Sequence, residues 1–308
     1  MNLISGLSKV FYWPVCRAYA RYLGDRPADA ILRSLCIPQF CLVNRFWPNF
    51  VHPSRFSEKI WSLQLHERDP KLTKISDKLR VRDYVASKVG GEYLIPLLWS
   101  GTDPTEIPYD ELPSKFVIKV NHGCEYNIFV RDKSELNREK VEQQLKKWLC
   151  TNFGNETFLG IAWGYRNIKP IILIESFLEE KDKVPPDYKF WCFSGRVEVI
   201  TVHFDRFQKH LVKTLDRNFK PYEFRFPLDN GGGEISPPKN YAEMVKIAES
   251  LAAEFDFMRV DLYNVAGKIY FGELTPYPGG VSARFEPAKL DFSLGEKWKS
   301  KFPPYQLI

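Results

Sequence analysis

Near its C-terminal end, the chain carries a β-hairpin pattern that constrains the fold more than any other segment. Two alternating runs, 258–263 and 268–274, flank a short turn containing Asn and Gly. Side chains alternate between the two faces of a strand, so Arg259 and Asp261 lie on one face, and Glu273 lies opposite or diagonal to Asp261 across the ladder. Two carboxylates at that distance repel unless a cation lies between them, and Mg²⁺ prefers oxygen ligands. The pattern predicts an antiparallel sheet with a candidate metal site; a surface salt bridge to Arg259 is the alternative.

A second candidate site follows the apolar run 116–120. Lys119, near the end of this run, precedes the turn sequence NHGCEY and another β-type run, 127–131. Backbone N–H groups of such a loop can surround phosphate oxygens, and the lysine can reach them. The alternative is a lysine that extends to solvent from an edge strand. Lys78, in a helix predicted over 76–89, is a weaker candidate of the same kind.

The rest of the chain mixes helices with short strands. The predicted helices are 56–69, 76–89, 134–152 and 241–254, the further strands are 93–100, 171–177, 188–193 and 197–204, and 216–240 is predicted as a long loop. Because most of these strands pair as hairpins, the order favours an α+β fold. With 308 residues, 44% of them hydrophobic and 27% charged, the chain has room for two domains, and global disorder is excluded.

The first sixty residues carry most of the positive charge. They hold eight Lys/Arg against three Asp/Glu, which is +5 of the chain's net +6. Large aromatic residues are interleaved with these cations, a pattern that suits an anionic membrane surface or a nucleic acid. The alternative is that the aromatic side chains pack on the main domain. The sequence shows no convincing signal peptide and no apolar run long enough to span a bilayer. The six cysteines form no CxxC pair, which predicts reduced thiols and a cytoplasmic location.

The order of these features resembles the ATP-grasp superfamily. More narrowly, the segments FVIKVNHGCEYNIFV, DYKFWCFSGRVEVI and RVDLYNVAGKIYFGELTPYPGG resemble the TupA-like ATP-grasp family, and the resemblance runs from about residue 53 to residue 295. It implies an α+β ATP-grasp fold in which two lobes clasp ATP. The implied parts are a basic helical extension (1–55), an N-terminal lobe (56–115), a central lobe with a phosphate flap (116–178) and a C-terminal lobe with the metal-binding hairpin (179–308).

The resemblance also implies a nucleotide site. Lys78 and Lys119 would contact the α- and β-phosphates beneath the flap. The flap residues that would bind nucleotide are Asn121, His122, Gly123 and Asn127. Glu175 would accept a hydrogen bond from the adenine amino group, and Asp187 would face the ribose. The backbone of the adenine hinge would come from Phe177 and Leu178.

At the triphosphate, the resemblance implies that Asp261 and Glu273 hold Mg²⁺. Thr275 stands where the family has a third ligand, Asn; because a hydroxyl is a poorer ligand, this departure weakens the case for a second Mg²⁺. Arg259 would stabilise the transferring phosphoryl group, and Arg206 would meet the γ-phosphate. The implied cofactors are ATP and Mg²⁺.

In ATP-grasp ligases a carboxylate takes the γ-phosphoryl group, and an amine then displaces phosphate from the acyl phosphate. The resemblance therefore implies an ADP-forming carboxylate-amine ligase of cell-surface polysaccharide modification, such as capsule or lipopolysaccharide. Its partners would be a uronic acid or amino-acid carboxylate on a glycan, with lipid-linked glycans among the candidates, and an amine donor. An anionic membrane surface would contact residues 1–50 at the inner face of the membrane, and no nucleic acid is expected. Two alternatives stay open: a kinase acting on a sugar hydroxyl, and a nucleotide-binding scaffold without turnover.

Overall fold

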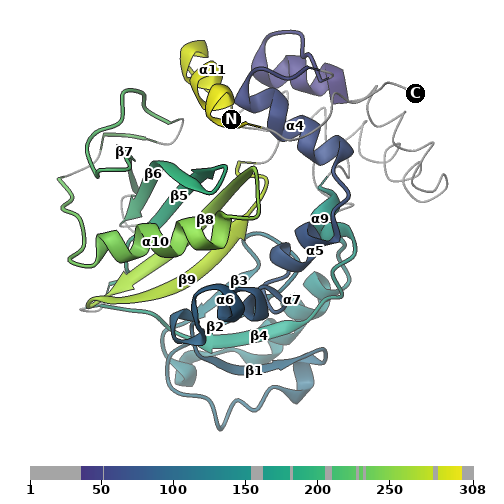
Figure 1. Ribbon diagram of the computed structural model, residues 1–308. Helices are drawn as coiled ribbons and strands as arrows, with labels where there is room; N and C mark the ends of the chain where they lie inside the picture. Colours follow the sequence, from purple (N-terminus) through teal and green to yellow (C-terminus); the bar gives the residue numbers. More distant parts are fainter. Residues whose placement is uncertain are drawn as a thin grey trace.

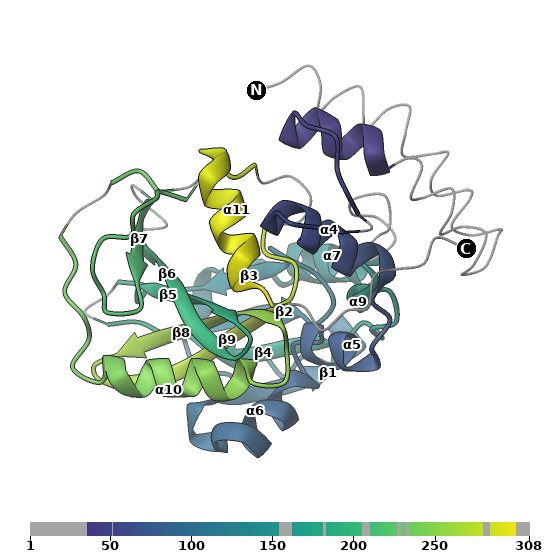
Figure 2. The same cartoon turned by 45° about the horizontal axis from the view of Figure 1, so that its top comes forward.

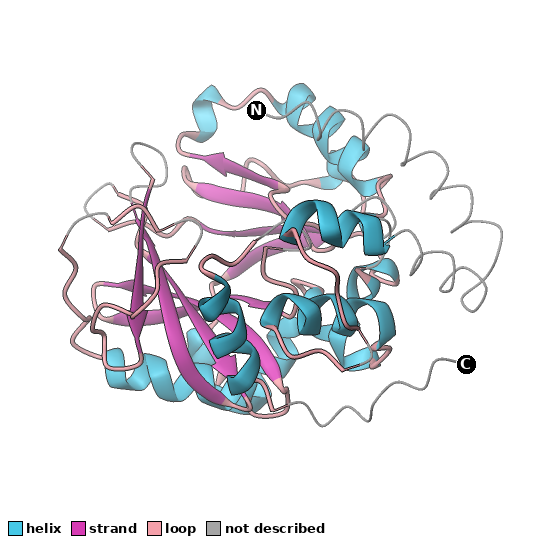
Figure 3. Ribbon diagram, turned by 90° about the horizontal axis from the view of Figure 1, so that it is seen from above, coloured by secondary structure: helices cyan, strands magenta, loops and turns pink. Residues whose placement is uncertain are grey.

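The protein contains two antiparallel sheets, each with helices packed against it (Figure 1). The computed structural model describes residues 36–50, 52–153, 162–180, 183–204, 210–226, 229–231, 234–279 and 284–299. Figure 3 shows the strands gathered into two separate sheets with helices around them. The predicted α+β class is confirmed.

The smaller sheet has four strands in the order β1-β4-β2-β3. Their bounds are Leu97–Gly101 for β1, Phe116–Val120 for β2, Asn127–Val130 for β3 and Ile172–Ser176 for β4. One face of β2 and β4 packs, with α7 (Arg138–Leu149), into a core that includes Phe116, Ile118 and Ile174. Because strand side chains alternate, Lys119 and Glu175 are on the other face.

The larger sheet has five strands in the order β7-β6-β5-β8-β9. Their bounds are Asp187–Phe193 for β5, Arg196–Phe204 for β6, Leu211–Asp216 for β7, Phe257–Val265 for β8 and Lys268–Thr275 for β9. Helix α10 (Tyr241–Ala252) covers one face, where Met258, Val260 and Leu262 of β8 are fully buried. The opposite face carries Arg259 and Asp261, as the alternating pattern predicted.

The β8–β9 hairpin is the sequence prediction that holds most closely. Its register places Asp261 directly opposite Glu273, with a β-bulge immediately after this pair. Gly272 forms the bulge, and a Cβ added there would lie 2.9 Å from the Tyr263 ring and 3.1 Å from the Asp261 carbonyl oxygen. A side chain at this position would crowd the Tyr263 ring and the Asp261 carbonyl group, which glycine avoids.

The remaining helices differ from the predicted ranges at their boundaries. The described ones are α4 (Phe56–His66), α5 (Pro70–Ser76), α6 (Val81–Val89), α9 (Trp163–Arg166) and α11 (Ala288–Lys297), with short 3₁₀ turns η2 (Gly91–Tyr93), η3 (Pro104–Glu106) and η4 (Lys133–Glu135). The helix predicted over 56–69 is followed by a second helix, because Asp69 caps a new N-terminus by accepting from the Lys71 N–H at 2.8 Å and Pro70 occupies its first position. Helix α11 and strand β7 were not predicted.

Residues 36–50 pack on α4 through aromatic contacts. Residues 36–44 are helical, and the Phe40 ring meets Phe46, Phe50 and Trp61 edge-on at centroid distances of 5.0, 5.3 and 5.2 Å. This supports the packing alternative for these rings, whereas Trp47 is 76% exposed. Residues 1–35, with most of the predicted membrane-facing aromatics, lie outside the described residues. Within the described part of the chain, no helix combines the length and apolar character needed to cross a bilayer.

Helix α11 ties the end of the described chain back to α4. Asp291 of α11 accepts hydrogen bonds from the Ser57 N–H at 2.8 Å and the Ser57 hydroxyl at 2.6 Å. The two helices lie side by side in Figure 2. Burial raises the pKa of the Asp291 carboxyl, an effect that the Ser57 hydrogen bonds oppose. This contact anchors the N-terminal α4 segment to the larger-sheet half of the protein.

Candidate active site

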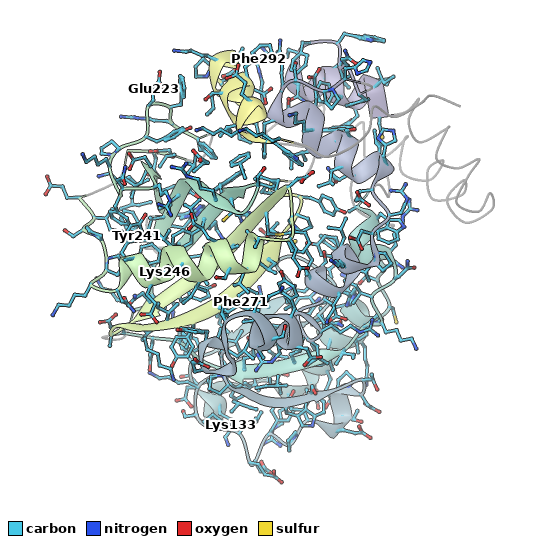
Figure 4. All side chains as sticks on the ribbon, viewed as in Figure 1. Lys133, Glu223, Tyr241, Lys246, Phe271 and Phe292 are labelled. Carbon is cyan, nitrogen blue, oxygen red and sulfur yellow. The ribbon has the colours of Figure 1, made fainter. Side chains whose placement is uncertain are left out.

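A cavity of about 610 Å³ lies between the two sheets. Its walls come from the strand faces that point away from the helices. The smaller sheet contributes Val117, Lys119, Leu173 and Glu175, and the larger sheet contributes Asp187, Lys189, Trp191, Thr201, Arg259, Asp261 and Glu273. Phe271 of β9 lies at the junction between the sheets (Figure 4). Alternation within each strand therefore places charged side chains from both sheets in one space.

On the larger sheet, most of the polar cavity residues lie in one row of side chains that pair directly across neighbouring strands. Thr201 pairs with Lys189, Lys189 with Asp261, and Asp261 with Glu273, so the row runs from β6 to β9. Arg259 lies in the next row, opposite Thr275. This pairing places the carboxylates of Asp261 and Glu273 close to the cationic side chains of Lys189 and Arg259.

Arg259 holds this row together. Its Nε and Nη2 donate to the two oxygens of Asp261 at 2.7 and 2.8 Å. The same Nη2 lies 3.4 Å from Glu273 Oε2 and donates to the Thr275 hydroxyl at 2.9 Å. Lys189 contacts Asp261 and also Asp187, the latter at 2.8 Å. Burial alone would raise the pKa of Asp261, but Arg259 and Lys189 outweigh it and lower that pKa to about 2, which keeps the carboxylate charged at neutral pH.

The donor set at this hairpin fits Mg²⁺ held jointly with a substrate. Mg²⁺ in phosphate-binding sites takes one or two protein carboxylates and completes its shell with phosphate oxygens and water. Asp261 and Glu273 supply that number, and Thr275 adds a hydroxyl that already accepts from Arg259. In the described ranges, no group of three or more His, Cys, Asp or Glu could hold a metal ion. The residues therefore suit a metal shared with a triphosphate rather than one enclosed by protein.

On the smaller sheet, Glu175 lies between two cations. Lys119 Nζ donates to Glu175 Oε2 at 2.6 Å, and Arg82 Nη1 donates to Glu175 Oε1 at 3.0 Å. Arg82 was not among the predicted site residues. In the helix predicted over 76–89 it follows Lys78 by four residues, a spacing that could have indicated a shared face, although α6 itself begins at Val81.

The residues predicted to form the phosphate flap divide into two groups. Asn127 lines the cavity, and Lys78 Nζ contacts the Gly123 carbonyl oxygen. By contrast, the Asn121 side chain is buried against Asp77 and Lys169, and His122 Nε2 lies 3.1 Å from the Trp148 carbonyl oxygen. Burial also lowers the pKa of His122, which disfavours its charged form. Neither of these two side chains lines the cavity.

Of the predicted site residues, ten line this cavity: Lys78, Lys119, Asn127, Glu175, Phe177, Leu178, Asp187, Arg259, Asp261 and Glu273. Asn121, His122, Gly123 and Thr275 adjoin it without lining it, and Arg206 lies outside the described residues. The apolar lining consists of Phe177 and Leu178 with further side chains: Ile95, Val117, Leu173, Val184, Pro185 and Phe271. These side chains suit a flat aromatic base, and the charged row suits phosphates.

Sequence reasoning missed the cavity wall over β5 to β7. Trp191, Thr201, His203 and His210 line it, and His203 Nδ1 lies 3.1 Å from His210 Nε2. It also missed Lys189. The alternation of DYKFWCF places Lys189 and Trp191 on the same face as Asp187, which was the available signal.

Two antiparallel sheets around one cavity, with two lysines and an acidic hairpin in its lining, are the features that the resemblance implied for an ATP-grasp protein. The family model described as TupA-like ATPgrasp matches residues 58–299. The chain therefore belongs to the TupA-like ATP-grasp family, as the resemblance indicated.

Solved structures with similar folds include several ATP-grasp ligases. The ATP-grasp ligase PsnB with its minimal precursor is 13% identical with a TM-score of 0.41, covering 74% of this chain and 62% of that chain. D-Alanine-D-alanine ligase from Helicobacter pylori is 16% identical with a TM-score of 0.43, covering 74% and 61%. The Bacillus anthracis D-alanine-D-alanine ligase complexed with ATP is 16% identical with a TM-score of 0.44, covering 74% and 66%. The chain thus spans under two thirds of the length of the first of these structures. No curated protein matches the sequence.

Proposed function

We propose that the protein is an ADP-forming carboxylate-amine ligase that uses Mg-ATP. The observation that carries this proposal is the cavity between the sheets, in which Lys119 faces a row containing Arg259, Asp261 and Glu273. Phosphoryl transfer needs little covalent help from a protein; it depends on positioning and on neutralising charge. The cations and carboxylates of this cavity meet both demands.

Each side chain has a proposed part. Lys78 and Lys119 neutralise phosphate oxygens from the smaller-sheet side, within the proposed lobes 56–115 and 116–178. From the lobe proposed over 179–308, Arg259 donates to the phosphoryl oxygens as charge develops on them. Mg²⁺, held by Asp261 and Glu273, would supply further positive charge at the terminal phosphates. The flap around Gly123 excludes water, which would hydrolyse an acyl phosphate.

The acceptor is proposed to lie over the β5–β7 wall. Trp191 offers an aromatic face, and Thr201 and His203 offer hydrogen-bonding groups, a combination that suits a hydroxylated ring. Together with the family relationship, this supports a carboxylate on a glycan as the acceptor and a role in modifying cell-surface polysaccharide. The amine donor would approach the acyl phosphate from the same side.

The first prediction concerns the products. With a cognate acid and hydroxylamine, we expect ADP and phosphate in equal amounts and a hydroxamate, because hydroxylamine intercepts acyl phosphates. Nucleotide chromatography and a colorimetric hydroxamate assay measure both. A phosphorylated sugar without hydroxamate would establish the kinase alternative, AMP as the main product would contradict γ-phosphoryl transfer, and binding without turnover of any acid would indicate a scaffold.

A second prediction concerns the membrane. Residues 1–35 hold five Lys/Arg and two Asp/Glu, and each basic residue near an anionic surface contributes on the order of 1 kcal/mol, a term that salt screens. We propose that this segment attaches the protein peripherally to the inner face of the membrane. The full chain should sediment with phosphatidylglycerol vesicles at low salt and less so at high salt.

The control for the membrane prediction is a chain that lacks residues 1–35 but keeps 36–50. Phe40, Phe46 and Phe50 then stay packed on Trp61, so stability should be retained while vesicle binding is lost. Phosphatidylcholine vesicles test the dependence on charge. A full chain that remains in the supernatant with anionic vesicles at low salt would rule out the attachment.

A further inference from the structure

Glu175 is held on both sides by positive charge. One oxygen accepts from Lys119 at 2.6 Å and the other from Arg82 at 3.0 Å. The three side chains are only 21%, 10% and 16% exposed for Lys119, Glu175 and Arg82. Hydrogen bonds between ionised groups with little solvent around them are roughly twice as strong as neutral ones. The three charges therefore form a single electrostatic unit on the cavity wall.

The fold brings this unit together from three separate elements. In the β2–β4 ladder Lys119 pairs with Leu173 and Val117 pairs with Glu175, so Lys119 and Glu175 are diagonal neighbours on one face. Arg82 comes from α6, and its Nη2 also donates to the Ile95 carbonyl oxygen at 2.9 Å. The second bond anchors the guanidinium, so its position does not depend on Glu175 alone.

The charge count explains why Arg82 matters. Lys119 and Glu175 by themselves sum to zero, which leaves no net attraction for a triphosphate. Arg82 restores a net charge of +1 to the unit. A lysine ammonium has three N–H donors, and Glu175 uses one, so two remain for phosphate oxygens. Glu175 thus directs the Lys119 ammonium. The negative charge of Glu175 would by itself cancel the positive charge of Lys119, and the positive charge of Arg82 compensates for it.

We propose that Glu175 and Arg82 are positioning residues for Lys119: Glu175 orients the ammonium toward the phosphates, and Arg82 neutralises Glu175 so that Lys119 keeps its attraction for the nucleotide. This rests on the proposed nucleotide site and replaces the adenine-reading role that the family resemblance implied for Glu175. The neutral amino group of adenine would add little binding energy as a donor to Glu175, because that carboxylate already accepts hydrogen bonds from Lys119 and Arg82.

Nucleotide affinity tests the charge balance. Isothermal titration of the full chain with Mg-ATP should show that Arg82→Met binds at least about tenfold more weakly. The variant loses the charged hydrogen bond from Arg82 to Glu175, so the negative charge of Glu175 then cancels the positive charge of Lys119. The double variant Arg82→Met/Glu175→Gln should recover most of that loss, because it restores the +1 charge. Arg82→Lys should bind nearly as the wild type. A double variant no better than Arg82→Met would overturn the charge balance, and so would wild-type affinity in Arg82→Met.

A matched control is Lys115→Met. Lys115 pairs with Glu179 at 2.7 Å next to the same sheet and does not line the cavity, so the same charge change should leave Mg-ATP affinity unaltered. Thermal melts of all variants separate folding from binding: a purely structural role would lower stability in Arg82→Met without the rescue of affinity in the double variant.

Turnover with two nucleotides tests the role of Glu175. Purine riboside triphosphate lacks the 6-amino group of ATP. If Glu175 orients Lys119, Glu175→Gln should lower kcat by a similar factor, about tenfold, with both nucleotides, because the ammonium is then misplaced although the net charge of the unit rises. A loss with ATP that is absent with purine riboside triphosphate would overturn the proposal. Failure of the wild type to bind Mg-ATP would instead contradict the proposed function itself, so the two failures are distinguishable.

Discussion

Replacing Glu273 with glutamine should lower ATP turnover by about a hundredfold to a thousandfold, the range expected when one preorganised group that stabilises developing charge is removed. The substitution keeps the shape of the side chain but removes its negative charge from the proposed Mg-triphosphate site. Its effect on stability should be small, because the Glu273 side chain is 31% exposed and its contact with Arg259 spans 3.4 Å. Steady-state ADP release and a thermal melt measure the two effects.

Asp261→Asn should differ from Glu273→Gln in one respect. Turnover should fall as far, but the free energy of unfolding should also fall by about 3–5 kcal/mol, because a buried charge would lose its partner. Asp261 is 4% exposed and accepts from both Arg259 and Lys189. The matched control is Glu243→Gln, which removes a carboxylate bonded to the Tyr93 hydroxyl outside the cavity and should leave turnover unchanged. An active Glu273→Gln enzyme with a lowered melting temperature would assign the hairpin to stability instead.

Replacing Arg259 with methionine should abolish measurable turnover and make stability depend on Mg²⁺. Arg259 lies between Asp261 and Glu273, so its loss leaves neighbouring carboxylates with less compensation and should cost about 3–5 kcal/mol. A divalent cation can relieve the same repulsion. Millimolar Mg²⁺ should therefore raise the melting temperature of Arg259→Met by several degrees and that of the wild type by much less.

The control for this effect is Arg217→Met. Arg217 Nη2 donates to both oxygens of Glu249, at 2.8 and 2.9 Å, beside the larger sheet but outside the cavity. That variant should lose stability without recovering it in Mg²⁺, because Glu249 lies on helix α10 and takes no part in the proposed metal site. Equal responses to Mg²⁺ in Arg217→Met and Arg259→Met would contradict a metal site at the hairpin.

The candidate site could be predicted to the extent that it depends on local pattern. Period-two alternation placed Arg259 and Asp261 on one face, and a short turn brought Glu273 opposite, which the register confirms. Predicted helix boundaries were less accurate where a cap begins a new helix. The helix predicted over 56–69 ends at His66, and Asp69 and Pro70 begin α5. Strand β7 escaped prediction because it forms by pairing with β6, a partner that a local reading of residues 211–216 does not reveal.

Local chemistry thus determined by itself the β8–β9 hairpin, the glycine-containing loop between β2 and β3, the α+β class and the charged residues proposed to bind phosphate. Only the tertiary structure decided which of these side chains share a space. Asn121 and His122 turned toward Asp77 and Trp148, whereas Arg82 and Lys189, absent from the predicted site, turned toward Glu175 and Asp261. The reason is that ion pairing and burial act between residues far apart in the chain, 93 positions for Arg82 and Glu175, and such pairs leave no periodic signal in either segment.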